Sequence, residues 1–202
     1  LLRILRKLYD TFPALEKVTL YAGPRSTLSK TPEELKALHD AGLSRAYLGV
    51  ESGSDAVLKF IHKGVNAQQM LQAGQRLVEA GIDLWVTIIL GITGEGGDWR
   101  EHILSTAQII NEMKPRHLSA MTFGDDVLAG RFKVYGPDHI LEECRLLIQH
   151  LDVDPLHFTS NHASNYLPLK GSLPQDREKF LSLIDQALEG KIRLRKTLNR
   201  GI

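Results

Sequence analysis

The sequence has 202 residues, of which 43% are hydrophobic and 24% charged, as is ordinary for a globular domain. Lys and Arg number 25 against 24 Asp and Glu, so the net charge gives no argument for a nucleic-acid partner. The longest apolar run, residues 84–92, is too short to cross a bilayer, and we expect no membrane partner.

The cysteine content limits both redox chemistry and metal binding. Cys144 is the one cysteine, which excludes a disulfide within the chain and fits a reducing cytosol. Residues 1–8 lack the cleavage site of a secretion signal, so we expect a cytoplasmic protein. One thiolate cannot ligate a 4Fe–4S cluster, and Cys144 falls on the apolar stripe of a predicted helix, where a buried, inert thiol is typical.

Short apolar strands alternate with amphipathic helices over the first 123 residues. The sequence predicts strands at residues 18–21, 46–50, 84–90 and 118–122. It predicts helices at residues 2–9, 32–41, 67–80 and 99–113. Thr31 with Glu34, and Asn66 with Gln69, have the spacing of capping boxes at the starts of two of these helices.

The spacing of these strands indicates a parallel sheet. They recur at roughly 30–40 residues, the length of a β/α unit with its crossover helix. The strand at residues 84–90 is apolar on both faces, as expected when helices cover a sheet. Both a doubly wound sheet and part of a barrel account for this pattern, and the periodicity does not distinguish them.

The pattern changes after residue 123. Residues 124–136 have the composition of a loop, and we expect a helix at 138–151, a short strand at 156–159 and a helix at 174–188. The tail from Lys191 to Arg200 is basic; we expect it to be solvated, with a weak RNA contact as the alternative. We predict a core domain at residues 1–136 and a helical C-terminal extension at 137–202. Since the chain opens inside a helix with no preceding strand, we expect it to be part of a longer protein.

Two loops lie where parallel β/α folds bind their ligands, at the carboxyl ends of the strands. Glu51 directly follows a strand, and a carboxylate in that place suits the vicinal hydroxyls of a sugar. The alternative reading is that Ser54 or Asp55 simply caps the next helix. Residues 91–97 contain four glycines, which let a ligand approach the backbone closely, but lack the Gly-Lys-Ser/Thr of a phosphate-binding loop.

These two loops belong to blocks that resemble a known family. Residues 49–55 read Gly-Val-Glu-Ser-Gly-Ser-Asp and are followed by Val-Leu-Lys at 57–59 and Lys-Gly at 63–64. This block is similar to the fourth-strand block of radical S-adenosylmethionine (SAM) enzymes, and residues 80–82 with 89–95 are similar to their fifth-strand block. The resemblance covers residues 15–123. It implies an α/β fold in which strands three to six form a partial parallel (β/α)6 TIM-like barrel, followed by the helical extension.

The resemblance also implies which residues bind SAM. The implied residues are Glu51 and Ser52 for the ribose hydroxyls, Gly91 and Ile92 for backbone contact with the adenine, and Thr122 and Phe123 for closing over the adenine face.

The cofactors of the intact parent would be SAM and a 4Fe–4S cluster. Reductive cleavage of SAM would give a 5′-deoxyadenosyl radical that abstracts hydrogen from an unknown small-molecule or macromolecular substrate. The family's Cys-x-x-x-Cys-x-x-Cys loop and its second-strand segment are absent from this sequence. We therefore expect no catalytic residue, no bound cofactor and no activity in this chain by itself. Two alternatives stay open, a non-catalytic binding module and a cluster-free β/α-barrel lyase or isomerase.

Three further residues are candidate substrate contacts. Arg25 follows the first strand and suits an acidic substrate group, while His162 and Asn165 lie in an Asn- and Ser-rich loop that we expect at the mouth of the barrel. We expect no metal site, because His157 and His162 lack a third converging ligand.

For several other residues we expect a structural or solvent-exposed position and no role in binding or catalysis. His62, His102 and His150 fall on predicted helix surfaces, where we expect them to be solvated. Trp85 alternates with Thr87 on a predicted strand and is more typical of a core than of a substrate platform. In the family the strand at residues 18–21 has a neighbour on each side, so here we expect an open sheet edge through which the chain dimerises.

Overall fold

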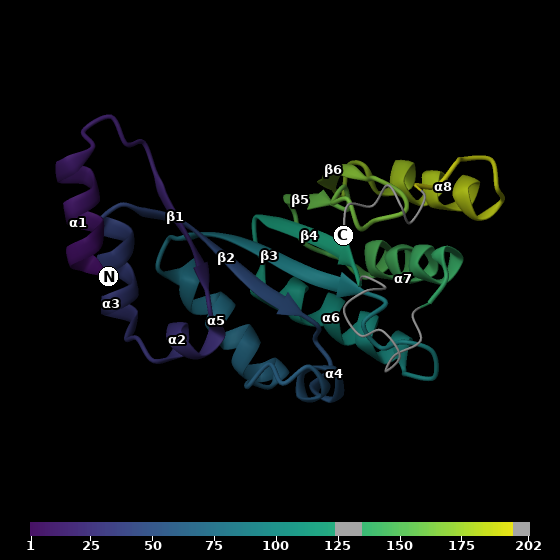
Figure 1. Ribbon diagram of the computed structural model, residues 1–202, viewed down its shortest axis with the longest axis horizontal. Helices are drawn as coiled ribbons and strands as arrows, with labels where there is room; N and C mark the ends of the chain where they lie inside the picture. Colours follow the sequence, from purple (N-terminus) through teal and green to yellow (C-terminus); the bar gives the residue numbers. More distant parts are fainter. Residues whose placement is uncertain (124–134, 196–202) are drawn as a thin grey trace.

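A six-stranded sheet runs through the computed structural model, which describes residues 1–123 and 135–195 (Figure 1). The strands are β1 (Val18–Ala22), β2 (Leu43–Glu51), β3 (Asp83–Leu90), β4 (His117–Thr122), β5 (Leu156–Thr159) and β6 (Lys170–Leu173). They lie in the order β1-β2-β3-β4-β5-β6; neighbours from β1 to β5 are parallel, and β6 is antiparallel to β5. The predicted fold class, a partial parallel β/α barrel, is confirmed.

Most of the helices connect the parallel strands and pack beside the sheet; the first precedes β1 and the last follows β6. They are α1 (Leu2–Thr11), α2 (Pro24–Leu28), α3 (Pro32–Asp40), α4 (Asp55–Phe60), α5 (Ala67–Glu79), α6 (Trp99–Met113), α7 (Pro137–His150) and α8 (Arg177–Leu188). Helices α5, α6 and α7 lie side by side along one face of the sheet (Figure 1). Within residues 1–123 and 135–195, no helix combines the length and the apolar character needed to cross a membrane.

The predicted capping boxes form and fix the starts of two helices. The Thr31 side chain accepts from the Glu34 backbone N–H while the Glu34 carboxylate accepts from the Thr31 N–H, at 3.2 and 2.8 Å. Asn66 and Gln69 exchange the same pair of bonds at the start of α5. Such caps satisfy backbone donors that have no partner inside the helix, which is why both starts were predictable from the sequence.

The face of the sheet that packs against the helices carries the core. From Ala46 onward in β2 and throughout β3 every second side chain is buried, and these buried residues are Ala46, Leu48, Val50, Leu84, Val86, Ile88 and Leu90. This alternation places the intervening residues on the opposite, concave face.

An aromatic row crosses the concave face in register over five strands. Its members are Tyr21, Tyr47, Trp85, His117 and His157, with successive ring centroids 5.4, 5.6, 3.8 and 4.9 Å apart. The Trp85 ring also lies 3.8 Å from the Arg45 guanidinium and stacks on His117 at 2°. Trp85 is therefore engaged by protein groups, but it is only partly buried and lies on the face opposite the core, so the expectation that it belongs to the core is wrong.

The structure differs from the sequence-based expectations at a buried histidine and at two short elements. His102, expected to be solvated, is fully buried in α6, so that prediction is wrong. Strand β6 and the short helix α2 were not predicted. The loop predicted at residues 124–136 and the end of the basic tail fall largely outside the described residues. The division into domains at residue 136 stays a prediction.

Candidate functional site

The carboxyl ends of β2, β3 and β4 bring residues from three separate loops to one edge of the sheet (Figure 1). Glu51 ends β2, Gly91 follows β3, and Thr122 ends β4. Since these strands are neighbours and parallel, the three positions lie along a single edge, as expected for a ligand site in this fold class.

The backbone at Glu51 turns its side chain back over β2. Its φ is +64°, in the left-handed region that residues other than glycine rarely adopt, and the pairing of β2 with β3 shifts register between Gly49 and Glu51. A Cβ atom on Gly49 would lie 2.2 Å from Oε1 of Glu51, so only glycine leaves room there for the carboxylate. The register shift and the glycine together fix where this carboxylate lies.

The two oxygens of the Glu51 carboxylate have different environments. Oε1 accepts from Lys63 Nζ at 2.9 Å, and the Glu51 and Lys63 side chains are 18% and 21% exposed. Oε2 is buried and has no hydrogen-bond partner among the residues that the structure describes. A buried oxygen without a donor costs free energy, so a hydroxyl donor is the complementary ligand group at this position.

Ser52 is held in place by His102, a residue of α6. His102 Nε2 lies 3.1 Å from the Ile89 carbonyl, which can only accept, so Nε2 carries the proton and Nδ1 accepts from the Ser52 hydroxyl at 2.7 Å. Ser52 Oγ in turn accepts from the Ser54 N–H at 2.9 Å. Burial lowers the pKa of His102 to about 4, which keeps the ring neutral. Both bonding roles of the Ser52 hydroxyl are thus taken within the protein.

Gly91 makes the turn that follows β3. Its φ is +77°, which favours glycine, and its N–H donates to Glu143 Oε2 of α7 at 2.6 Å. Burial raises the pKa of Glu143 to about 7, with the Gly91 N–H opposing that rise. Ile92 is buried beside it.

Thr122 and Asn165 are brought together at the end of β4. Thr122 Oγ1 donates to Asn165 Oδ1 at 2.8 Å, and Asn165 Nδ2 donates to the Ala120 carbonyl at 2.9 Å. The Phe123 N–H donates to the Leu90 carbonyl at 2.9 Å. Asn165 therefore ties the connection between β5 and β6 to β4.

Arg25 and His162 lie apart from each other in the structure. Arg25 is exposed on α2, where its Cδ is 3.6 Å from the position of a Cβ on Gly64, next to Lys63. His162 is exposed, and its Nδ1 lies 2.9 Å from Ser164 Oγ. Arg195, expected in the solvated tail, donates to the His162 carbonyl at 3.0 Å. These substrate assignments stay predictions.

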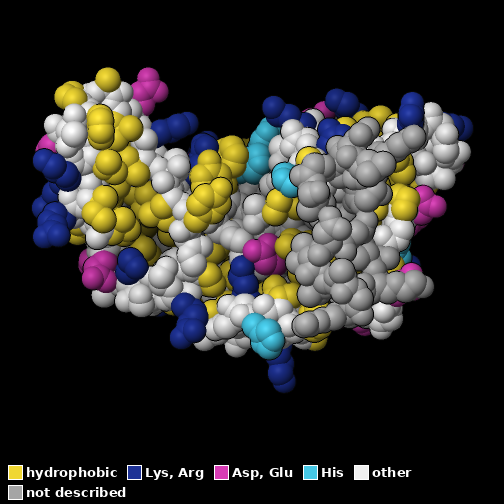
Figure 2. All heavy atoms as spheres, in the orientation of Figure 1, with side chains coloured by type: hydrophobic (Ala, Val, Ile, Leu, Met, Phe, Trp, Pro, Cys, Tyr) yellow, Lys and Arg dark blue, Asp and Glu magenta, His cyan; other side chains and the backbone are white. Residues whose placement is uncertain are grey.

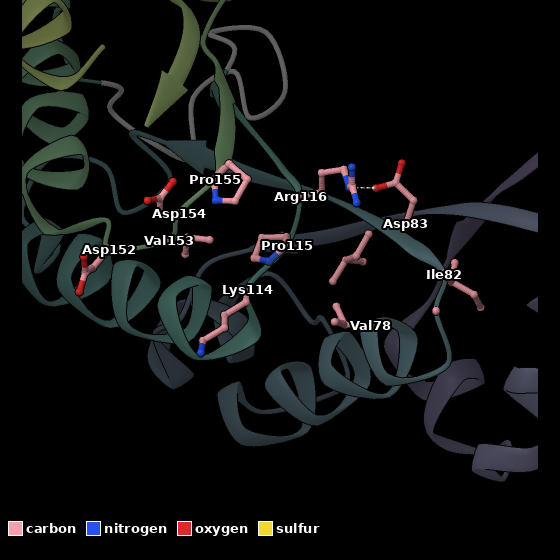
Figure 3. Close-up of a pocket in the computed structure, with 12 residues that line it drawn as sticks. Val78, Ile82, Asp83, Lys114, Pro115, Arg116, Asp152, Val153, Asp154 and Pro155 are labelled. Carbon is pink, nitrogen blue, oxygen red and sulfur yellow. Dashed lines mark ion pairs between the residues drawn. The ribbon is translucent and has the colours of Figure 1, made fainter. Parts of the chain in front are cut away.

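Two pockets lie at opposite ends of the strands, one near their carboxyl ends and one near their amino ends. One of about 350 Å³ is next to the glycine-containing loop, between Ile92, Glu95 and the α4 residue Val57. A larger one of about 680 Å³ lies at the amino ends of β3, β4 and β5, where Arg116 pairs with Asp83 at 3.5 Å (Figure 3). The larger pocket is thus remote from the edge that carries Glu51.

The residues present fit one implied cofactor and not the other. The buried, unpartnered Glu51 oxygen fits the ribose hydroxyls of SAM. The chain does not fit an iron–sulfur cluster, because its one cysteine, Cys144, is buried on α7, where burial raises the pKa of the thiol to about 12. No group of three or more His, Cys, Asp or Glu in residues 1–123 and 135–195 is placed to hold a metal ion.

Sequence reasoning missed three residues that shape this edge. Lys63 belongs to the block that resembles the family's fourth-strand block, but no role was predicted for it from the sequence. His102 has the helical spacing that places it on one face of α6 with Thr106, Ile109 and Met113, and its position on this mostly apolar stripe was a signal for burial. Glu143 likewise falls between Ile140 and Cys144 on the apolar stripe of α7.

Comparisons with known proteins identify the family. The radical SAM superfamily model matches residues 1–107, more than half of the sequence, and the chain belongs to that superfamily. No curated protein matches the sequence.

Several solved structures share the fold. Coproporphyrinogen III oxidase (HemN) from Escherichia coli is 18% identical with a TM-score of 0.58, covering 73% of this chain and 35% of HemN. Elp3 from Methanocaldococcus infernus is 17% identical with a TM-score of 0.55, covering 89% of this chain and 43% of Elp3. Methylornithine synthase (PylB) is 12% identical with a TM-score of 0.52, covering 98% of this chain and 64% of PylB. The chain thus spans less than half the length of HemN or Elp3.

Proposed function

We propose that this chain supplies one wall of the SAM site of a radical SAM enzyme, with Glu51 binding the ribose hydroxyls. The observation that carries the proposal is the Glu51 carboxylate, whose Oε1 is paired with Lys63 while its Oε2 is buried and has no donor among residues 1–123 and 135–195. Membership of the superfamily supports SAM as the ligand. Two vicinal hydroxyls are complementary to a carboxylate held in this way.

The surrounding residues hold this carboxylate in place. Lys63 fixes Oε1, so Oε2 keeps one orientation before the ligand arrives. The bonds from Ser52 to His102 and from Gly53 N–H to Thr106 Oγ1, at 2.7 and 2.8 Å, anchor the segment that follows Glu51. Preorganisation of this kind lowers the entropic cost of binding.

The chemistry of the reaction belongs to the cofactors. SAM supplies a sulfonium carbon–sulfur bond that radical SAM enzymes break by one-electron reduction. The chain offers no ligand set for the cluster that delivers the electron, so we propose that it binds SAM but does not cleave it alone. The substrate of the parent protein is proposed only as a small molecule or macromolecule held at the same edge.

Calorimetric titration of the chain with SAM tests the binding proposal. We expect Glu51→Gln to weaken binding at least about tenfold, the usual effect of losing a charge-assisted hydrogen bond. Glu79→Gln, at an exposed carboxylate on α5, is the matched control and should leave the affinity unchanged. Adenosine should bind more tightly than 2′-deoxyadenosine to the wild-type chain, and this preference should disappear in Glu51→Gln. Failure of the wild-type chain to bind SAM, or equal affinity in Glu51→Gln, would overturn the proposal.

Anaerobic incubation tests the inactivity of the isolated chain. The chain is supplied with iron, sulfide, dithionite and SAM, and released methionine is measured. We expect no methionine above the protein-free background. Methionine release proportional to the chain's concentration would contradict this part of the proposal.

A further inference from the structure

We infer that Glu143 of α7 is a positioning residue for the SAM site, which it shapes by holding the backbone turn at Gly91. This inference rests on the proposed function, since it assigns Gly91 a place beside the ligand. It adds a residue from a part of the chain that the family model, which ends at residue 107, does not match.

The contact between Glu143 and Gly91 is short and fully buried. Glu143 has no solvent exposure, and its Oε2 accepts from the Gly91 N–H at 2.6 Å. Removing a carboxylate from water is costly, and a single backbone N–H offsets only part of that cost. An apolar side chain would fill this buried space without the cost of desolvating a charge, but it could not accept from the Gly91 N–H, so the carboxylate points to the turn that it holds.

The side chain one helical turn earlier also contacts this turn. A Cβ atom on Gly91 would lie 2.5 Å from Cδ1 of Ile140, which is three residues before Glu143 on the same helix face. Gly91 is therefore confined from two sides, by a hydrogen bond to its N–H and by packing against its Cα. Its φ of +77° lies in the left-handed region, which glycine adopts at little cost.

A second contact attaches α7 to the far end of the same loop. The Tyr135 hydroxyl donates to the Gly97 carbonyl at 3.5 Å. The His139 ring stacks on Tyr135 with centroids 3.5 Å apart and meets the Trp99 ring edge-on at 4.9 Å. Gly91 is thus held by α7 and Gly97 by Tyr135, two residues before that helix, so the loop that carries Ile92 is held at both ends.

The groups that face Glu143 leave its carboxylate without a full counter-charge. On its own helix His139 Nε2 lies 3.4 Å from Oε1, and burial lowers the pKa of His139, which favours the neutral ring. The Cys144 thiol beside it has a pKa raised by burial and by Glu143. Tyr135 precedes the helix, and burial raises its pKa, to which the Glu143 charge adds. From β3 the partner of Glu143 is the Gly91 N–H.

Nuclear magnetic resonance of the ligand-free chain tests the contact itself. The Gly91 amide resonance should titrate with an apparent pKa near 7 in the wild-type chain and should not titrate in Glu143→Gln. His139→Gln should leave that titration in place, which separates it from protonation of the neighbouring ring. A Gly91 resonance that does not move between pH 3 and pH 9, roughly the range that includes both the ordinary and the raised pKa of a glutamate, would overturn the inference.

Titration with SAM then tests the consequence for the ligand. We expect Glu143→Leu to weaken SAM binding about tenfold, because it leaves the Gly91 N–H without an acceptor, and Glu143→Gln to restore most of the affinity. Glu142→Gln, on the exposed side of α7, is the matched control. If Glu51→Gln weakens binding and neither Glu143 variant does, the inference fails while the proposed function stands. If Glu51→Gln also leaves SAM binding unchanged, the proposed function fails, and the inference that rests on it fails as well.

Discussion

The Nδ1 atom of His102 lies 2.7 Å from the Oγ atom of Ser52, fifty residues earlier in the chain. This bond joins α6 to the segment that follows β2, and the other ring nitrogen of His102 binds the end of β3 through the Ile89 carbonyl at 3.1 Å. One buried imidazole therefore links two of the loops that form the candidate site.

Removal of this imidazole should destabilise the protein. We expect His102→Ala to lower the free energy of unfolding by about 2–4 kcal/mol, since it creates a cavity and leaves buried polar groups without partners. His62→Asn, at an exposed position with a φ of +53° that asparagine tolerates, should change it by less than about 0.5 kcal/mol. Urea unfolding at pH 7.5 measures both. A change below about 1 kcal/mol in His102→Ala would show that this network adds little.

His102 should also make stability depend on pH in the acid range. Because its pKa is about 4 in the folded protein and 6.5 unfolded, the unfolded chain binds the extra proton first as the pH falls below 6.5. This group alone should therefore remove about 3 kcal/mol of stability between pH 6.5 and pH 4. Unfolding curves of the wild-type chain and His102→Gln across this range measure the difference, which should narrow toward pH 4.

Glu143 should make the stability of the protein depend on pH in the opposite direction. Its pKa is about 7 in the folded protein against 4.5 unfolded, so the folded state binds more protons between these values, and stability falls as the pH rises from 4.5 to 7. We expect Glu143→Gln to remove this loss, so that the variant gains on the wild-type chain by up to about 3 kcal/mol as the pH rises through that interval. A constant difference between the two proteins from pH 4.5 to pH 8 would contradict the raised pKa.

Gly49 should be irreplaceable for binding and dispensable for folding. Alanine there would place its Cβ 2.2 Å from Oε1 of Glu51 and 3.3 Å from Nζ of Lys63, so the ion pair must shift. We expect SAM affinity to fall about tenfold in Gly49→Ala, with a small change in stability because alanine suits a strand as well as glycine does. Gly23→Ala, whose Cβ would meet only Ser26 Oγ at 3.6 Å, is the control. Unchanged affinity in Gly49→Ala would count against Glu51 as the ribose ligand.

The free edge of β1 should pair with another chain. No described strand pairs with its outer side, and Tyr21 on it is 91% exposed. Hydrophobic side chains gather over α1 and β1 in Figure 2. Ile4 of α1 and Phe12, the residue after that helix, are both exposed. We predict a dimer by light scattering at about 100 μM, and a shift to monomer in Tyr21→Lys, because charge on an edge strand opposes pairing. A monomer in the wild-type chain at that concentration would refute the prediction.

The parts of the fold that were predictable depend on local signals. The capping boxes at Thr31 and Asn66 and the apolar runs in β2, β3 and β4 act within a few residues, so those elements could be located within a few residues from the sequence. Strand β6 has no such pattern; it forms because it pairs with β5 across the connection that Asn165 anchors to β4. Long-range pairing of this kind is set by the tertiary structure.

The candidate site was predictable only in part, for a similar reason. The block at residues 49–55 identified Glu51, but the partners that decide what its neighbours do come from distant elements. Ser52 is engaged by His102, and Gly91 by Glu143, over separations of 50 and 52 residues. A polar residue on an apolar helix stripe was the signal available for both partners, and it was read as solvation for His102.

The antiparallel pairing of β6 limits how this sheet can be extended. A right-handed β/α unit adds a strand parallel to its neighbour, so beside β6 it would run against β1–β5. Additional β/α units that keep the common strand direction can therefore join only beside β1. On the opposite side of the sheet, the antiparallel strand β6 prevents such an extension. An insertion or fusion that enlarges the barrel with parallel strands must therefore be attached beside β1.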